Sequence, residues 1–167
     1  MKIEEYRKSL KHILRPRTVS FLIKGDQILL GFKKSGFGKG NFVGIGGKVE
    51  HGETVEEGAI RELQEEIHVK AIQSAMKEVA ILHFYFPHIK DESWNQVVHA
   101  FLVTEWEGEP KETEEIRPEW YAKDTIPFDH MWSDAKLWIP RILTGDILKT
   151  EFLYDTDLNV IDHRDVV

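Results

Sequence analysis

The chain has 167 residues, no cysteine and a formal net charge of −7 at pH 7. This length suits one domain with a single core, and the lack of cysteine excludes disulfide scaffolds, thiol catalysis and cysteine-zinc sites. The lack of cysteine also favours a reducing compartment, so we expect a cytoplasmic protein. The negative charge argues against a nucleic acid polymer as partner, because such binders show a basic stripe, but it is compatible with a small metal-bound phosphate.

Residues 1–17 are expected to form an N-terminal extension with a short helix. Ile3, Tyr6, Leu10 and Ile13 recur near helical spacing, which predicts an amphipathic helix packed on the domain. The segment mixes basic and acidic residues and lacks an apolar signal core, so secretion is not expected. All apolar runs of the chain are far shorter than the roughly 20 residues that cross a bilayer, which predicts that no membrane is involved.

The next segments predict a β-hairpin, a loop and a short strand. Two apolar runs at 18–23 and 27–32 flank the turn-type residues 24–26. A glycine-rich loop, KKSGFGKGNF, then leads into a short strand predicted from Val43 toward Val49.

The segment from Thr54 to about Ile67 predicts a helix with two distinct faces. The apolar face, which we expect to pack on the sheet, consists of Ala59, Ile60, Leu63 and Ile67. The adjoining face carries three carboxylates that repel one another, Glu62, Glu65 and Glu66. A divalent cation such as Mg²⁺ takes oxygen ligands and would neutralise them. The alternative interpretation is a merely solvated acidic face.

The second half of the chain predicts further strands and a second helix. Strands are expected at 80–86, at 97–105 and at Trp120 and Tyr121 after Pro118. Ser133 is the expected cap of a helix that runs to about Leu143 with Pro140 inside it, and a closing hairpin is expected around residues 155–157. Residues 18–167 are therefore predicted to form a single α/β domain with a mixed sheet.

The acidic helix belongs to a longer pattern. Gly47 is followed after five residues by Glu53, and after seven more by the run RELQEE at 61–66. This pattern resembles the Nudix box, the signature of Nudix hydrolases, at nearly every fixed position. The box ordinarily closes with a glycine where this chain has His68, and a histidine adopts the left-handed conformation there at a cost of about 1 kcal/mol.

The resemblance implies a Nudix fold, with a mixed β-sheet sandwiched between α-helices, and hydrolysis of a nucleoside diphosphate linked to another moiety by metal-activated water. The implied metal is Mg²⁺, with Mn²⁺ as a possible substitute. Its implied ligands are Glu62, Glu65, Glu66 and Glu115, of which Glu115 is also a candidate assistant base. The resemblance also implies that Glu53 and Arg61 hold loop and helix together by an ion pair and that Gly47 permits a close backbone approach.

Beyond the box, the stretches GFKKSGFGKG, EEIRPEW and IPFDHMWSDAKLWIP are similar to the MutT-homologue subgroup, from about Phe32 to Tyr154. This resemblance implies a purine pocket in which Phe37 and Trp138 form walls, Trp132 stacks on the base and Asp134 binds its edge. The full set of expected substrate-binding residues is Lys33, Phe37, Val43, Gly46, Gly47, Lys48, His83, Trp132, Asp134 and Trp138.

Two positions depart from the subgroup. Val43 stands where the subgroup has an asparagine that contacts the base, and Ala135 replaces the second of two adjacent aspartates. Part of the polar base readout is therefore missing, which affects discrimination of 8-oxoguanine and not triphosphate hydrolysis. His83 or Tyr85, expected on a strand facing the pocket, is a candidate substitute, and the alternative for His83 is a structural role.

The leading hypothesis is a Mg²⁺-dependent pyrophosphohydrolase that converts oxidised purine nucleoside triphosphates to monophosphate and pyrophosphate, as a monomer or weak dimer. One alternative is the same chemistry on ordinary dNTPs, a dinucleoside polyphosphate or a nucleotide sugar. The other is a catalytically silent nucleotide-binding module, which has no evident need for the mutually repelling glutamates.

Overall fold

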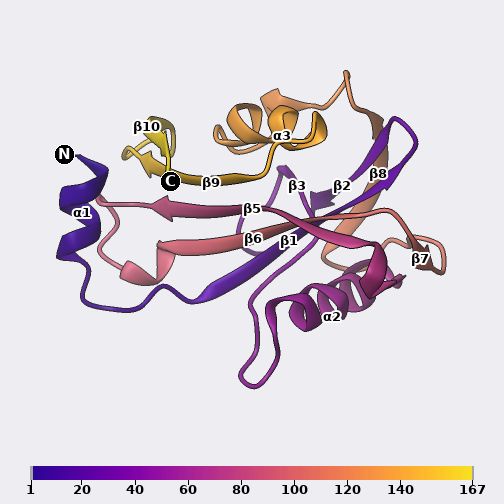
Figure 1. Cartoon of the computed structure of the whole chain (residues 1–167). Coiled ribbons are helices and arrows are strands. Elements are labelled where there is room, and N and C mark those ends of the chain that lie inside the picture. Colours follow the sequence, from indigo (N-terminus) through magenta and orange to yellow (C-terminus); the bar gives the residue numbers. More distant parts are fainter. Residues whose placement is uncertain (1, 167) are drawn as a thin grey trace.

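The computed structural model describes residues 2–166, and Figure 1 shows a twisted sheet with α2 on one face and α3 on the other. The helices are α1 (Ile3–Ser9), α2 (Val55–Ile67) and α3 (Ala135–Leu143). The strands are β1 (Pro16–Lys24), β2 (Gln27–Lys33), β3 (Phe42–Val43), β4 (Lys70–Ala71), β5 (Met76–Tyr85), β6 (Gln96–Val103), β7 (Trp106–Glu107), β8 (Ile116–Ala122), β9 (Leu148–Tyr154) and β10 (Val160–Asp165). Short 3₁₀ helices lie at Gln73–Ala75, Glu92–Trp94 and Phe128–His130.

The main sheet is mixed. Its strands lie in the order β10-β9-β5-β6-β1-β2-β3, and β8 pairs with β2. β1 runs parallel to β6 and β5 runs parallel to β9, while β5 and β6 are antiparallel. The predicted α/β class and the sheet between helices are confirmed. No helix within residues 2–166 is both long enough and apolar enough to cross a membrane.

Both predicted hairpins are present. β1 and β2 pair up to the turn, where Lys24 faces Gln27, and Gly25 adopts a positive φ of 61°. The closing hairpin pairs β9 with β10. Its turn is fixed by Asp155, whose Oδ1 accepts the backbone N–H groups of Asp157 and Asn159, both at 2.9 Å.

Helix α2 begins and ends as the sequence predicts. Thr54 Oγ1 accepts the Glu57 N–H at 3.1 Å and the Glu57 carboxylate accepts the Thr54 N–H at 3.2 Å, so the two residues cap the helix reciprocally. His68 ends it in the left-handed region with φ 61°. The apolar face is buried at Ala59, Leu63 and Ile67, with Ile60 half-buried.

Three other predictions of the sequence are wrong in detail. The strand predicted over 43–49 ends at Val43, and only isolated bridges join Ile45 to Ser20 and Lys48 to Arg17. β8 begins before Pro118, which is tolerated because β8 pairs with β2 alone among the described strands. Ser133 does not cap α3, because its hydroxyl accepts the Val160 N–H at 2.9 Å instead.

The core is divided by the sheet. The buried cluster on the α3 side includes Phe21, Trp138 and Phe152, and the one on the α2 side includes Leu22, Leu63 and Phe101. A smaller cluster under α1 joins Ile3 and Tyr6 to Tyr85 and Leu153. This last contact attaches the N-terminal segment to the face of β5 and β9.

Candidate active site

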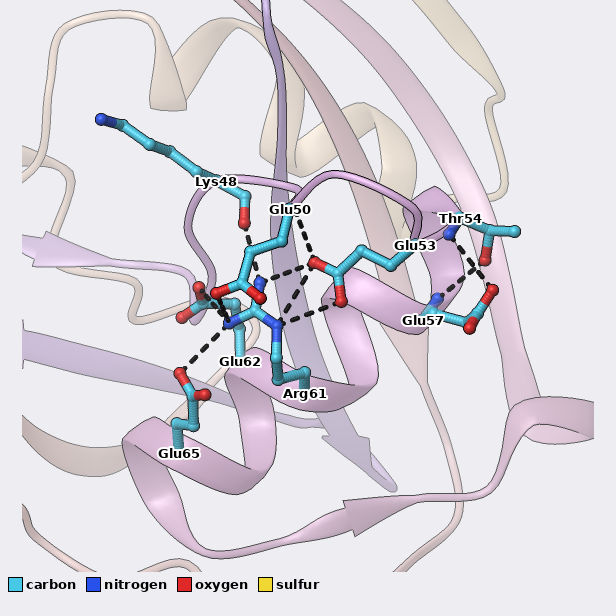
Figure 2. A network of polar contacts seen from close by, with 8 residues as sticks. All are labelled: Lys48, Glu50, Glu53, Thr54, Glu57, Arg61, Glu62 and Glu65. Atoms are coloured by element: carbon cyan, nitrogen blue, oxygen red, sulfur yellow. Dashed lines mark hydrogen bonds and ion pairs between the residues drawn. The ribbon is translucent and has the colours of Figure 1, made fainter.

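Arg61 joins the loop before α2 to the helix itself (Figure 2). Its guanidinium donates to Glu53, with Nη2 to Oε1 at 2.7 Å and Nε to Oε2 at 3.1 Å, and to the Lys48 carbonyl oxygen at 2.9 Å. The expected ion pair between Glu53 and Arg61 is therefore present. The hydrogen bonds from Arg61 hold the pKa of the Glu53 carboxyl below its usual range.

The same guanidinium reaches two of the three glutamates expected to face a metal. Arg61 Nη1 lies 3.0 Å from Glu62 Oε1 and 3.1 Å from Glu65 Oε2 (Figure 2). Across residues 2–166 no group of three acidic or histidine side chains is already spaced to hold a metal ion. Arg61 holds Glu62 and Glu65 on one guanidinium nitrogen.

The third glutamate of this face, Glu66, has a different environment. Its side chain is buried, and no salt bridge reaches it within the described chain. Burial, followed by the negative charge of Glu62, raises the pKa of Glu66 to about 7, and the charge of Glu115 adds to the effect. Burial also raises the pKa of Glu62. The carboxylates of Glu62, Glu66 and Glu115 carry like charges, and a hard divalent cation would neutralise them. This set of oxygen donors therefore fits such an ion.

Two glycines allow this crowding. A Cβ atom on Gly47 would lie 2.6 Å from Glu62 Oε1, and one on Gly46 would lie 1.9 Å from the Thr18 carbonyl oxygen. The backbone of residues 46 and 47 thus runs directly against β1 and Glu62, as the resemblance implied for Gly47.

Glu115 enters from the loop before β8. The Glu115 carbonyl accepts the Lys34 N–H at 2.7 Å, and Thr113 Oγ1 donates to the Glu66 carbonyl at 2.8 Å, so this loop is fastened to both β2 and α2. The resulting cleft, which we call the glutamate cleft, has a volume of about 630 Å³. It is lined by Arg17, Lys33, Gly46, Gly47, Lys48, Glu62, Glu65, Glu66, Thr113, Glu114 and Glu115.

A second, mostly apolar cavity of about 190 Å³ adjoins this cleft, and we call it the base cavity. Eight of the expected substrate-binding residues line it together with Glu66, namely Lys33, Phe37, Val43, Gly46, Gly47, Trp132, Asp134 and Trp138. The two cavities share Arg17, Lys33, Gly46, Gly47 and Glu66. They therefore form one continuous site, apolar at one end and acidic at the other.

Aromatic and polar contacts shape the apolar end. Trp132 stacks on Phe37 with ring centroids 5.3 Å apart and planes inclined by 20°. Asp134 is buried and accepts hydrogen bonds from Trp138 Nε1 at 2.8 Å and from the Tyr154 hydroxyl. Burial raises the pKa of Asp134, although both donors act in the opposite direction. Asp134 is therefore a fixed polar group held between two aromatic side chains.

Comparison with known proteins decides the family. Residues 14–142 match the model of the NUDIX domain. The chain belongs to the Nudix hydrolases. As a Nudix hydrolase it is an enzyme of a family that generally needs a divalent cation, and the site described above contains the donors for one.

This Nudix hydrolase has close curated relatives. It is 36% identical over 147 residues to the oxidized purine nucleoside triphosphate hydrolase of Danio rerio, covering 88% of this chain and 91% of that protein. It is 40% identical over 129 residues to the protein of the same name from Mus musculus, covering 75% and 78%. Among solved structures it is similar to the MutT protein of Bacillus halodurans, with a TM-score of 0.76, 26% identity and coverage of 91% and 97%.

The structure corrects the expectation for His83. Along β5 the side chains of Leu82 and Phe84 line the base cavity, so the alternation of a strand turns His83 and Tyr85 to the opposite face. Tyr85 packs there on Tyr6 of α1, with ring centroids 5.9 Å apart. The Nδ1 atom of His83 is buried, and no hydrogen-bond partner for it lies in the described chain. Neither residue compensates for Val43 and Ala135.

Two residues of the Nudix hydrolase site were missed by sequence reasoning. Arg17 lines both cavities and is half-buried, and burial lowers its pKa despite the nearby charge of Glu62. Tyr154 lines the base cavity and holds Asp134. Arg17 lies among exposed basic residues of the N-terminal segment, and Tyr154 lies in an apolar strand, so neither stands out in the sequence.

Proposed function

We propose that this Nudix hydrolase converts oxidised purine nucleoside triphosphates, such as 8-oxo-dGTP, to monophosphate and pyrophosphate, and so cleanses the nucleotide pool. The observation that carries the proposal is the continuity of the base cavity with the glutamate cleft through Glu66, Gly46 and Gly47. A base in the first would place its phosphates in the second. The names of the Danio rerio and Mus musculus relatives support the same substrate class.

The chain's own groups divide the work along this path. Arg17 and Lys33 line the glutamate cleft, where they would offset the charge of the phosphates. Gly46 and Gly47 bring the backbone close to the same cleft. A divalent cation held by Glu62, Glu65, Glu66 and Glu115, which we take to be Mg²⁺ or Mn²⁺, would neutralise further phosphate charge and activate the attacking water. Glu115, exposed at the rim, is the proposed assistant base, because an exposed carboxylate can pass the proton on to solvent.

The base end supplies stacking and one polar contact. Trp132 offers an indole face, and base stacking on an aromatic ring stabilises binding by about 1 to 3 kcal/mol. For a base to stack there, Phe37 must leave its present stack on Trp132 or become the other side of a sandwich. Asp134, with its raised pKa, is suited to share a proton with the edge of a purine.

A second candidate function is hydrolysis of ordinary nucleoside triphosphates. The observation that favours it is the apolar lining at Val43 and Ala135, where the related subgroup has polar residues. A site discriminates strongly only through polar groups that are left unpaired by the wrong base.

A substrate panel tests both functions. Purified protein with Mg²⁺ is assayed against ordinary and oxidised purine triphosphates, and the products are separated by chromatography. We expect monophosphate and pyrophosphate, with the higher kcat/KM for oxidised purines. Equal kcat/KM values would favour the second function, and orthophosphate with a diphosphate would contradict the proposed bond cleavage.

We further propose that the enzyme works in the cytoplasm as a monomer or weak dimer. A cysteine-free sequence suits a reducing compartment. Light scattering during size-exclusion chromatography measures the oligomeric state directly.

A further inference from the structure

A third groove, which we call the basic groove, opens beside the nucleotide site. Its volume is about 1150 Å³, and its two walls are residues 11–17 after α1 and residues 90–96 between β5 and β6. Ligand pockets commonly have volumes of about 300 to 1,000 Å³. The basic groove is therefore large enough for a ligand moiety of its own.

The lining of the basic groove is positive in a chain with a net charge of −7. Its permanent cations are Lys11, Arg15, Arg17, Lys48 and Lys90, against the two acids Asp91 and Glu92. No ion pair engages any of these five cations in residues 2–166. These cations are thus available to an anionic ligand.

The two acids are instead held by the groove's own backbone. Glu92 Oε1 accepts the Lys11 N–H at 3.1 Å, and its other oxygen lies 3.7 Å from His12 Nε2. Asp91 Oδ1 accepts the Ser93 N–H at 2.9 Å. Glu92 therefore joins the two walls, whereas Asp91 stays within its own wall.

The walls are anchored to the folded core. Tyr6 of α1 accepts a hydrogen bond from Asn95 Nδ2 at 3.0 Å, and Asn95 Oδ1 accepts the Phe86 N–H at 2.8 Å, both buried. Trp94 meets Phe37 edge to face, with ring centroids 4.9 Å apart. The 90–96 wall is therefore tied to α1 and to Phe37, and Leu14 of the other wall packs against the cluster under α1.

The basic groove borders both ends of the nucleotide site, and it shares Phe37 and Gln96 with the base cavity alone. Arg17 lines the groove, the base cavity and the glutamate cleft, and Lys48 lines the groove and the cleft. Phosphates that leave the cleft past Arg17 and Lys48 would enter a positive channel.

We propose that the basic groove is a second anion subsite, which binds an oligophosphate beyond the phosphate that is hydrolysed. The proposal rests on the proposed function, since that function sets the direction of the nucleotide from the base cavity to the cleft. The oligophosphate has two possible sources, the distal phosphates of a substrate with more than three phosphates and the released pyrophosphate.

The test compares the wild type with two charge-reversal variants. The groove variant, Arg15→Glu/Lys90→Glu, changes two exposed residues that line the basic groove and lie outside the glutamate cleft. The control variant, Lys24→Glu/Lys136→Glu, makes the same change in charge at two exposed lysines outside the groove. Calorimetry measures the affinity for inorganic tripolyphosphate with Mg²⁺, and circular dichroism checks folding. We expect the groove variant to bind tripolyphosphate about tenfold more weakly than the control variant. Equal affinities in the two variants would overturn the proposal.

Kinetics with one nucleoside then identify the source. If the groove holds distal phosphates, the groove variant loses kcat/KM for the 5′-tetraphosphate and keeps it for the 5′-triphosphate. If it holds product, the two substrates change alike and inhibition by pyrophosphate weakens. The calorimetric test of the basic groove does not require turnover. If the wild type fails to hydrolyse purine triphosphates, the proposed function is refuted, and the calorimetry still tests the groove.

Discussion

Among single residues, Glu66 combines burial with negative neighbours. We predict that Glu66→Gln lowers kcat by about 10² to 10⁴, since the amide keeps the shape and loses the charge that binds a cation or accepts a proton. Stopped assays with Mg²⁺ measure the loss. Glu56→Gln is the matched control on the same helix, because Glu56 does not line the glutamate cleft, and it should change kcat little. A Glu66→Gln enzyme with normal kcat would remove Glu66 from the catalytic set.

Asp134 has a structural task that the sequence did not reveal, because it accepts hydrogen bonds from Trp138 and Tyr154. We predict that Asp134→Ala raises KM for purine triphosphates about tenfold with a smaller effect on kcat. It should also lower the free energy of unfolding by about 1 to 3 kcal/mol, because two buried donors lose their acceptor.

Tyr154→Phe separates the two effects of Asp134. It removes one donor and keeps the carboxyl group, so it should lower stability without the increase in KM. Steady-state kinetics and urea unfolding measure both quantities. If Tyr154→Phe and Asp134→Ala raise KM equally, Asp134 acts on the pocket only by supporting its shape.

At the scale of single elements, the end of α2 is the clearest departure from the family pattern. His68 has a positive φ of 61°, a conformation in which glycine is unstrained. We predict that His68→Gly raises the free energy of unfolding by about 0.5 to 1 kcal/mol and leaves kcat unchanged. Gln64→Gly, at an exposed position inside the same helix, should lower it by about 1 kcal/mol. Urea unfolding of both variants gives the two signs.

Helix α2 was predictable because its signals are local. The reciprocal cap of Thr54 and Glu57, the apolar period and the helix end lie within one short stretch of sequence. β3 was predicted too long because the chain leaves β2 after Val43 and meets β1 only through isolated bridges at Ile45 and Lys48, contacts between distant segments. His83 was misplaced for a similar reason, since a period of two defines two faces of a strand and does not say which one meets the ligand.

The resemblance supplied the expected glutamates and most of the residues that line the base cavity, whereas two further lining residues needed the assembled fold. Arg17 and Tyr154 reach that cavity from opposite ends of the chain. Their neighbours in sequence give no sign of it, because the contacts that define them are all long-range.

The stability of the whole molecule should depend on pH through Glu66. Its pKa is raised from 4.5 to about 7 by folding, so the folded state keeps a proton that the unfolded state releases. We predict that, in EDTA, the free energy of unfolding falls by about 3 kcal/mol relative to Glu66→Gln as pH rises from about 4 to 8. The stabilisation by the retained proton is therefore complete below the unfolded-state pKa of 4.5, and it is lost as pH rises through the folded-state pKa of about 7.

Urea unfolding of both proteins across this pH range measures the difference. Added Mg²⁺ should restore stability to the wild type at pH 8 and not to Glu66→Gln, because a bound cation favours the ionised carboxylate. A wild type whose stability runs parallel to that of Glu66→Gln at all pH values would refute the assignment of this proton to Glu66.

The docking of α1 joins segments that are far apart in sequence and are therefore made at different times. Arg7 reaches the buried carboxylate of Glu151, and Ile3 and Tyr6 share a cluster with Leu153. On the ribosome, α1 emerges before β9 and finds these partners only after β9 has been made. Until then its seven residues are too few to hold a helix in water, and its apolar side chains stay exposed. The walls of the basic groove, which depend on Tyr6 for their anchoring, should therefore be among the last parts of the molecule to form.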